Sequence, residues 1–122
     1  MPLDKQARSY LWDIHEAARE IKEFLSGVKF HEFEKNKVLR YAVERQLLVI
    51  GEAAVHISPQ FRKKHPEINW ARLVELRNVL AHEYGETLTN RVWLAATQGL
   101  AEVLEPLEKL ISDEENQEAD EK

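Results

Sequence analysis

The sequence contains no cysteine among its 122 residues. This absence excludes disulfide bonds, thiolate nucleophiles and sulfur-ligated metal sites. No apolar run approaches the roughly 18 residues that a membrane-spanning helix needs, and the N-terminus M-P-L-D-K-Q-A-R has no apolar stretch ahead of a small-residue cleavage site. We therefore expect no secretory signal, no association with a membrane and a cytoplasmic location.

Glycine is scarce as well, with four residues in the chain, and these form no glycine-rich phosphate loop. Five histidines are present, but none belongs to an H-E-x-x-H motif. Four of them lack the paired spacing of a metal site, namely His15, His31, His56 and His65. We therefore predict neither a metal nor another cofactor.

Apolar residues, by contrast, recur at helical spacing along most of the chain. Between residues 4 and 26 they recur at steps of three and four, as in an amphipathic helix, at Ala7, Leu11, Ile14, Ala18, Ile21 and Leu25. Similar patterns predict helices over about 36–57, from Trp70 to near Gly85, and over about 89–111, with Asn69 capping the third. Because no alternating strand pattern occurs, we predict an all-α protein, an antiparallel bundle of four main helices.

Charge divides the chain into two unequal parts. Six of the 22 acidic residues and one of the 17 basic residues fall within 112–122, so residues 1–111 carry 16 of each sign. We predict one helical-bundle domain over 1–111 and an acidic, disordered tail over 112–122. A neutral folded part neither favours nor excludes a local basic patch for nucleic acid.

Polar residues cluster within eight positions at the end of the third predicted helix: Arg77, Asn78, His82 and Tyr84. Asn78 and His82 share a helix face, about 40° apart, whereas Arg77 and His82 are roughly 140° apart on an ideal helix. Either Arg77 uses its long reach, or the helix distorts near its end, or a second copy of the chain completes the site across a two-fold interface. We favour the interface between two copies.

These residue types suit the cleavage of RNA without a metal. The ribose 2′-hydroxyl must lose a proton and the leaving oxygen must gain one, and histidine titrates near neutral pH and can do either. The planar, permanently charged Arg77 can hold phosphate oxygens while charge develops. Asn78 can hold a phosphate or orient His82.

The segment R-N-V-L-A-H-E-Y over 77–84 resembles the R-x-x-x-x-H-x-Y motif of HepT-like toxins, a branch of the HEPN ribonucleases. Three more segments are similar to that family and follow its order: A-V-E-R-Q-L-L-V-I-G-E-A-A over 42–54, P-E-I-N-W over 66–70 and R-V-W over 91–93. The resemblance covers most of residues 4–111.

The resemblance implies a HEPN helical bundle that forms a homodimer, with a metal-independent endoribonuclease site in which Arg77 and His82 are catalytic and Asn78 supports them. It further implies a toxin of a type VII-like toxin–antitoxin pair. In such a pair an MntA-like nucleotidyltransferase antitoxin transfers AMP to the motif tyrosine, here Tyr84. The added phosphodiester anion, two residues from His82, could pair with Arg77 and exclude the RNA phosphate. The RNA substrates implied are transfer RNA or messenger RNA.

Two further groups of charged residues leave alternatives open. Glu44, Arg45 and Glu52 lie in an otherwise apolar helix, where they either form an internal ion pair or shape the cleft and orient Arg77. The second group comprises Arg62, Lys63 and Lys64. It is either a solvated basic turn or a track for RNA phosphates.

A binding module is the alternative function. A helical dimer could position a nucleotidyltransferase partner, or bind a nucleotide, without cleaving RNA, and Tyr84 would then be present only for modification. Cleavage of RNA in excess EDTA distinguishes the two functions.

Overall fold

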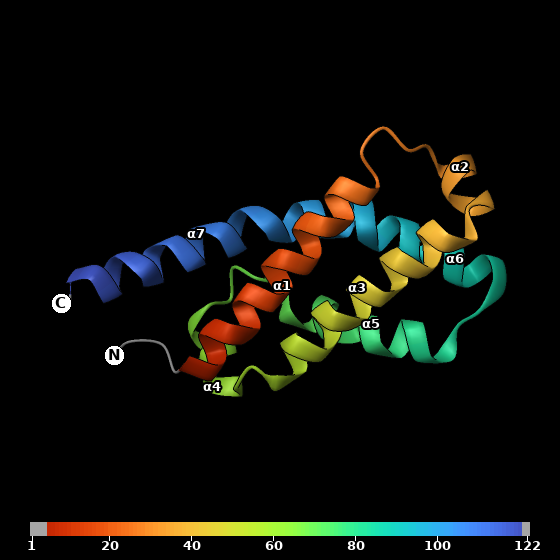
Figure 1. Cartoon of the computed structure of the whole chain (residues 1–122). Coiled ribbons are helices and arrows are strands. Elements are labelled where there is room, and N and C mark those ends of the chain that lie inside the picture. The colour runs from red at the N-terminus through yellow and green to blue at the C-terminus, as the bar shows by residue number, and fades with distance from the viewer. Residues whose placement is uncertain (1–4, 121–122) are drawn as a thin grey trace.

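The computed structural model describes residues 5–120, and this part of the chain is helical with no strand. The elements follow in the order α1 Lys5–Phe24, α2 Phe30–Lys35, α3 Lys37–His56, α4 Pro59–Lys64, α5 Trp70–His82, α6 Gly85–Leu94, the π-helical segment η1 Ala95–Gly99, and α7 Leu100–Asp120 (Figure 1). The all-α bundle is thus confirmed, and the four predicted main helices correspond to α1, α3, α5 and the continuous run from α6 to α7.

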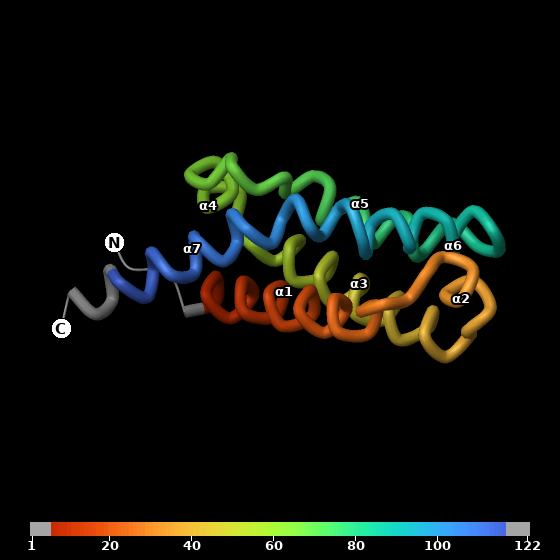
Figure 2. Tube along the Cα trace, turned by 90° about the horizontal axis from the view of Figure 1, so that it is seen from above, coloured from red at the N-terminus to blue at the C-terminus, as the bar shows by residue number. Residues whose placement is uncertain are grey.

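Helix α3 lies at the centre of the bundle, because it packs against both α1 and α5. The predicted stripe of α1 faces inward, and Leu11, Ile14 and Ile21 are fully buried. Leu47 and Ile50 of α3 are buried in the same core cluster. Helix α7 runs alongside α1 and closes the other side (Figure 2). Burial of such side chains contributes about 1.5–3 kcal/mol each, which makes this shared core the main source of stability.

Two short helices were not predicted. The basic group Arg62, Lys63 and Lys64, for which a solvated turn was one expectation, lies in α4. Ser58 caps this helix by accepting a hydrogen bond from the Phe61 amide at 3.2 Å, Pro59 occupies the first helical turn, and Phe61 is buried. The Ser-Pro pair that ends α3 therefore also starts the next helix, as proline favours the first helical position.

The fourth predicted helix begins earlier than its apolar pattern indicated. Residue 89 was the expected start, but α6 begins at Gly85 and continues through η1 into α7. Gly85 has a φ of +66°, a conformation that glycine adopts without strain, so the chain turns at this position and then enters a helix. Pro106 lies inside α7 without ending it.

Helix α7 continues through the acidic segment as far as Asp120, and residues 121–122 lie outside the described residues, so the expected disorder of 112–122 stays a prediction. The segment after Leu110 contains neither glycine nor proline and is rich in glutamate, which favours the helix once it has started. Among the residues of α7 up to 116, Leu110 is the last buried one, and the helix then projects beyond the bundle (Figure 1). The division into a domain over 1–111 and a tail over 112–122 stays a prediction. Among the helices of residues 5–120, none is long and apolar enough to cross a membrane.

Candidate active site

Helix α5 carries the motif on its exposed side. Asn69 caps the helix by accepting a hydrogen bond from the Arg72 amide at 3.1 Å, as predicted. Leu73 and Leu76 are buried against the bundle. Because these leucines anchor one side of the helix, Arg77 and the residues that follow it are left near the surface.

Arg77 is oriented by α3. Its Nε lies 2.7 Å from Oε1 of Glu52, and each side chain keeps a little under half of its surface exposed. No described residue accepts a hydrogen bond from the terminal nitrogens of Arg77. A guanidinium offers five N–H donors, so an ion pair at Nε leaves the outer donors available for a phosphate.

Gly51 makes this pairing possible. A Cβ atom at this buried position would lie 3.0 Å from Cγ of Arg77 and 3.2 Å from its backbone nitrogen. Helices α3 and α5 therefore approach each other closely where the arginine leaves α5. The next residue on α3 is Glu52, which the close approach brings to the guanidinium.

His82 is the last residue of α5, and its side chain is exposed. The ring makes no hydrogen bond or ion pair with any residue between 5 and 120. Asn78 donates to Oε2 of Glu75 at 3.3 Å, so no direct bond from Asn78 orients the imidazole. The imidazole is therefore accessible to a ligand from outside the chain.

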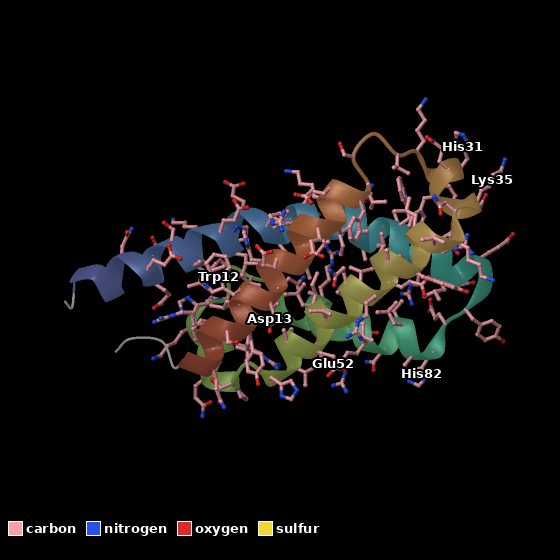
Figure 3. The ribbon with its side chains drawn as sticks, viewed as in Figure 1. Trp12, Asp13, His31, Lys35, Glu52 and His82 are labelled. Atoms are coloured by element: carbon pink, nitrogen blue, oxygen red, sulfur yellow. The ribbon has the colours of Figure 1, made fainter. Side chains whose placement is uncertain are left out.

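Within one chain, Arg77 and His82 do not converge on a single point. Helix α5 is regular through both residues, so the offset of roughly 140° between them persists. Arg77 is turned toward Glu52 on α3, and Figure 3 shows Glu52 and His82 on the same side of the molecule, from α3 and α5. Arg77 and His82 therefore lie on one surface of the chain without forming a common pocket.

Tyr84 is the most exposed large hydrophobic residue described, with 85% of its surface accessible. It stands between α5 and α6 in an extended conformation, and its side chain makes no capping hydrogen bond. Its hydroxyl is therefore open to a second protein. The residue before it, Glu83, is ion-paired with Arg91 of α6, a contact that sequence analysis missed.

The three polar residues within α3 take different roles. An ion pair within the group does not form, and Glu52 pairs outside it with Arg77. Arg45 and Glu52 line a shallow groove between α1 and α3. Burial raises the pKa of Glu44, and the nearby charge of Arg40 lowers it by less.

The basic group on α4 does not act as a unit. Arg62 donates from Nη2 to the carbonyl oxygens of Ala54 and Val55, at 2.8 and 3.0 Å, and so satisfies the C-terminal end of α3. This structural task occupies Arg62. Lys63 and Lys64 are exposed, and their contact with RNA stays a prediction.

Comparison with known proteins shows to which family the chain belongs. The model of the family described as "Ribonuclease HepT-like" matches residues 14–110. The chain belongs to this family. The match spans α3, α5 and the run from α6 into α7, and therefore includes the whole motif segment.

Several relatives carry ribonuclease names. "Putative RNase MJ1380" of Methanocaldococcus jannaschii is 42% identical over 80 residues, which are 66% of this chain and 73% of the relative. "Putative RNase MJ1216" of the same organism is 35% identical and covers 89% of this chain and 90% of its own. "Probable ribonuclease HepT" of Thermococcus cleftensis is 32% identical and covers 88% and 98%. No solved structure shows significant similarity to the chain.

Proposed function

We propose that this protein is a metal-independent endoribonuclease in which Arg77 and His82 carry the chemistry. The observation that supports this most is that the side chains of Arg77 and His82 both have polar atoms available to a substrate. Arg77 is held at Nε by Glu52 with its outer donors free, and His82 is exposed at the end of α5 without a partner in the described chain. Membership of a ribonuclease family gives these groups an RNA phosphate to act on.

The reaction needs two proton transfers and one charge stabilisation. A His82 imidazole accepts the proton of a ribose 2′-hydroxyl, whose oxygen attacks the adjacent phosphorus. The bond from phosphorus to the 5′-oxygen breaks, and a second imidazole donates a proton to that oxygen. Arg77 stabilises the charge that develops on the phosphate. The products are a 2′,3′-cyclic phosphate and a 5′-hydroxyl end.

A homodimer supplies the two histidines that this scheme requires. One chain offers a single His82, which lies away from Arg77 around α5, whereas a two-fold axis would bring two copies of each residue to one cleft. Helix α3 exposes Val38 and Tyr41, at 80% and 56% of their surfaces, near its first turn. Such apolar exposure on a helix next to α5 favours an interface there. We place the active site at this interface.

Tyr84 would control the enzyme. An MntA-like nucleotidyltransferase antitoxin would transfer AMP to its hydroxyl, which the exposure of the side chain permits. The phosphodiester would then lie two residues from His82, where a negative charge competes with the RNA backbone for Arg77. The protein would thus be the toxin of a type VII-like toxin–antitoxin pair, with transfer RNA or messenger RNA as its substrate.

Cleavage of transfer RNA and messenger RNA in excess EDTA tests the proposal. We expect wild-type protein lacking AMP to cleave, His82→Ala to lose about 10²–10⁴-fold in rate, and Arg77→Ala about 10²–10³-fold. His31→Ala is the matched control, because His31 is also exposed but lies on α2. Activity that survives both substitutions, or that disappears with EDTA, contradicts the site.

The alternative of a non-catalytic partner for a nucleotidyltransferase draws on one observation, the exposure of Tyr84. A helical module that only presents a tyrosine would need nothing more. Mass spectrometry after incubation with a cognate nucleotidyltransferase and ATP would show the addition of AMP under either function. Wild-type protein that accepts AMP but cleaves no RNA in its unmodified form would favour the alternative.

A further inference from the structure

The joint between α5 and α6 carries both His82 and Tyr84 but has little helical structure of its own. Helix α5 ends at His82, and the next two residues are extended, with φ of −110° at Glu83 and −153° at Tyr84. The Glu83 amide donates to the carbonyl of Val79 at 3.0 Å, which closes the last turn of α5. On the other side of the joint, the backbone bond from Leu88 to Tyr84 is long, at 3.5 Å.

Glu83 behaves differently from the residues on either side of it. His82 and Tyr84 are exposed, whereas the Glu83 side chain keeps 25% of its surface. One carboxylate oxygen accepts a hydrogen bond from Nη1 of Arg91, eight residues away on α6. The other oxygen is buried and has no hydrogen-bond partner. Because this carboxylate is partly removed from water, the stability of its charged form depends on the ion pair with Arg91.

We propose that Glu83 and Arg91 form a positioning pair that holds the α5–α6 joint and thereby sets where His82 and Tyr84 point. The carboxylate lies between the two functional residues in the chain and is turned to the opposite helix, so it fixes the backbone from which both side chains leave. Neither member of the pair touches substrate in this scheme. They act through the direction of His82 and Tyr84 alone.

This inference rests on the proposed ribonuclease function, and the pair is therefore tested by cleavage and by a measurement that needs no RNA. The variants are Glu83→Ala, Arg91→Ala and the exchange Glu83→Arg with Arg91→Glu. The control is Arg72→Ala, because Arg72 and Glu102 form another ion pair between elements of the bundle, from α5 to α7, away from the joint.

We expect each single variant at the joint to lower kcat about 10- to 100-fold with KM within about twofold, since small misplacements of a reacting group cost rate more than binding. The exchange variant should recover most of the loss. Arg72→Ala should keep wild-type kcat. A joint variant with wild-type kcat, or an equal loss in the control, would overturn the pairing, and so would an exchange variant no better than the single ones.

The second measurement is the imidazole resonance of His82 in nuclear magnetic resonance spectra, assigned by its disappearance in His82→Gln. We expect this resonance to shift or broaden in Glu83→Ala and to stay unchanged in Arg72→Ala. If wild type fails to cleave RNA while the resonance responds as expected, the ribonuclease proposal is wrong and the positioning pair stands. An unchanged resonance in Glu83→Ala would reject the pair even where RNA is cleaved.

Discussion

The close approach of α3 and α5 at Gly51 predicts the effect of adding a single methyl group. In Gly51→Ala the new Cβ would lie 3.0 Å from Cγ of Arg77, 3.2 Å from its backbone nitrogen and 3.4 Å from the Leu73 carbonyl oxygen. Two of these three atoms belong to the backbone, and Cγ is the near end of its side chain. Helix α5 must therefore move by a few tenths of an ångström, because no flexible end can swing away.

Two opposing effects set the magnitude. Alanine is favoured over glycine within a helix by about 1 kcal/mol, while overpacking of a filled contact costs about 1–3 kcal/mol. Gly99→Ala is the matched control, since its nearest neighbour would be the Leu94 carbonyl oxygen at an ordinary 3.8 Å. Both variants gain the preference for alanine, so the difference between them, about 1–3 kcal/mol, measures the contact alone.

Thermal unfolding gives this difference directly. With about 4 °C per kcal/mol for a domain of this size, Gly51→Ala should melt roughly 4–12 °C below Gly99→Ala. Cleavage of RNA should also fall in Gly51→Ala, because Arg77 and Glu52 no longer meet in the same geometry, and should persist in Gly99→Ala. Equal melting temperatures for the two variants would refute the close packing of these helices.

Three further results are expected. Glu52→Gln should lower the rate of cleavage about tenfold, because the ion pair that orients Arg77 is lost. The free energy of unfolding should change by less than about 1 kcal/mol, because the pair is half exposed. An unchanged rate would show that Arg77 needs no such partner. Burial raises the pKa of Glu44, so its contribution to stability is lost as pH rises through that raised value, and Glu44→Gln should gain more stability over wild type near pH 7 than near pH 4 in chemical denaturation. Deletion of 112–122 should leave the melting temperature and cleavage unchanged, because none of residues 111–116 is buried and Leu110 is the last buried residue before them. A marked drop in either would place the domain boundary later.

Much of the fold was predictable from the sequence because helical periodicity is a local signal. The stripe of α1 and the cap at Asn69 follow from side chains within a few residues of each other, and both are present in the structure. The start of α6 was harder, because a glycine at positive φ can end one helix or begin another. The backbone conformation of the acidic segment is hard to predict for a similar reason, since charge indicates exposure and leaves the conformation open.

The candidate site also has features that the local sequence indicates and features that depend on contacts between helices. The sequence by itself determined which residues are candidates for the chemistry, because Arg77, His82 and Tyr84 stand out by type and spacing. The helical geometry of α5 already separates the first two. Only the tertiary structure decided which groups act on them. Glu52 reaches Arg77 because Gly51 lets two helices approach, and Arg91 holds Glu83 across a joint of two extended residues. These contacts depend on distances between helices, which no periodicity within one helix contains.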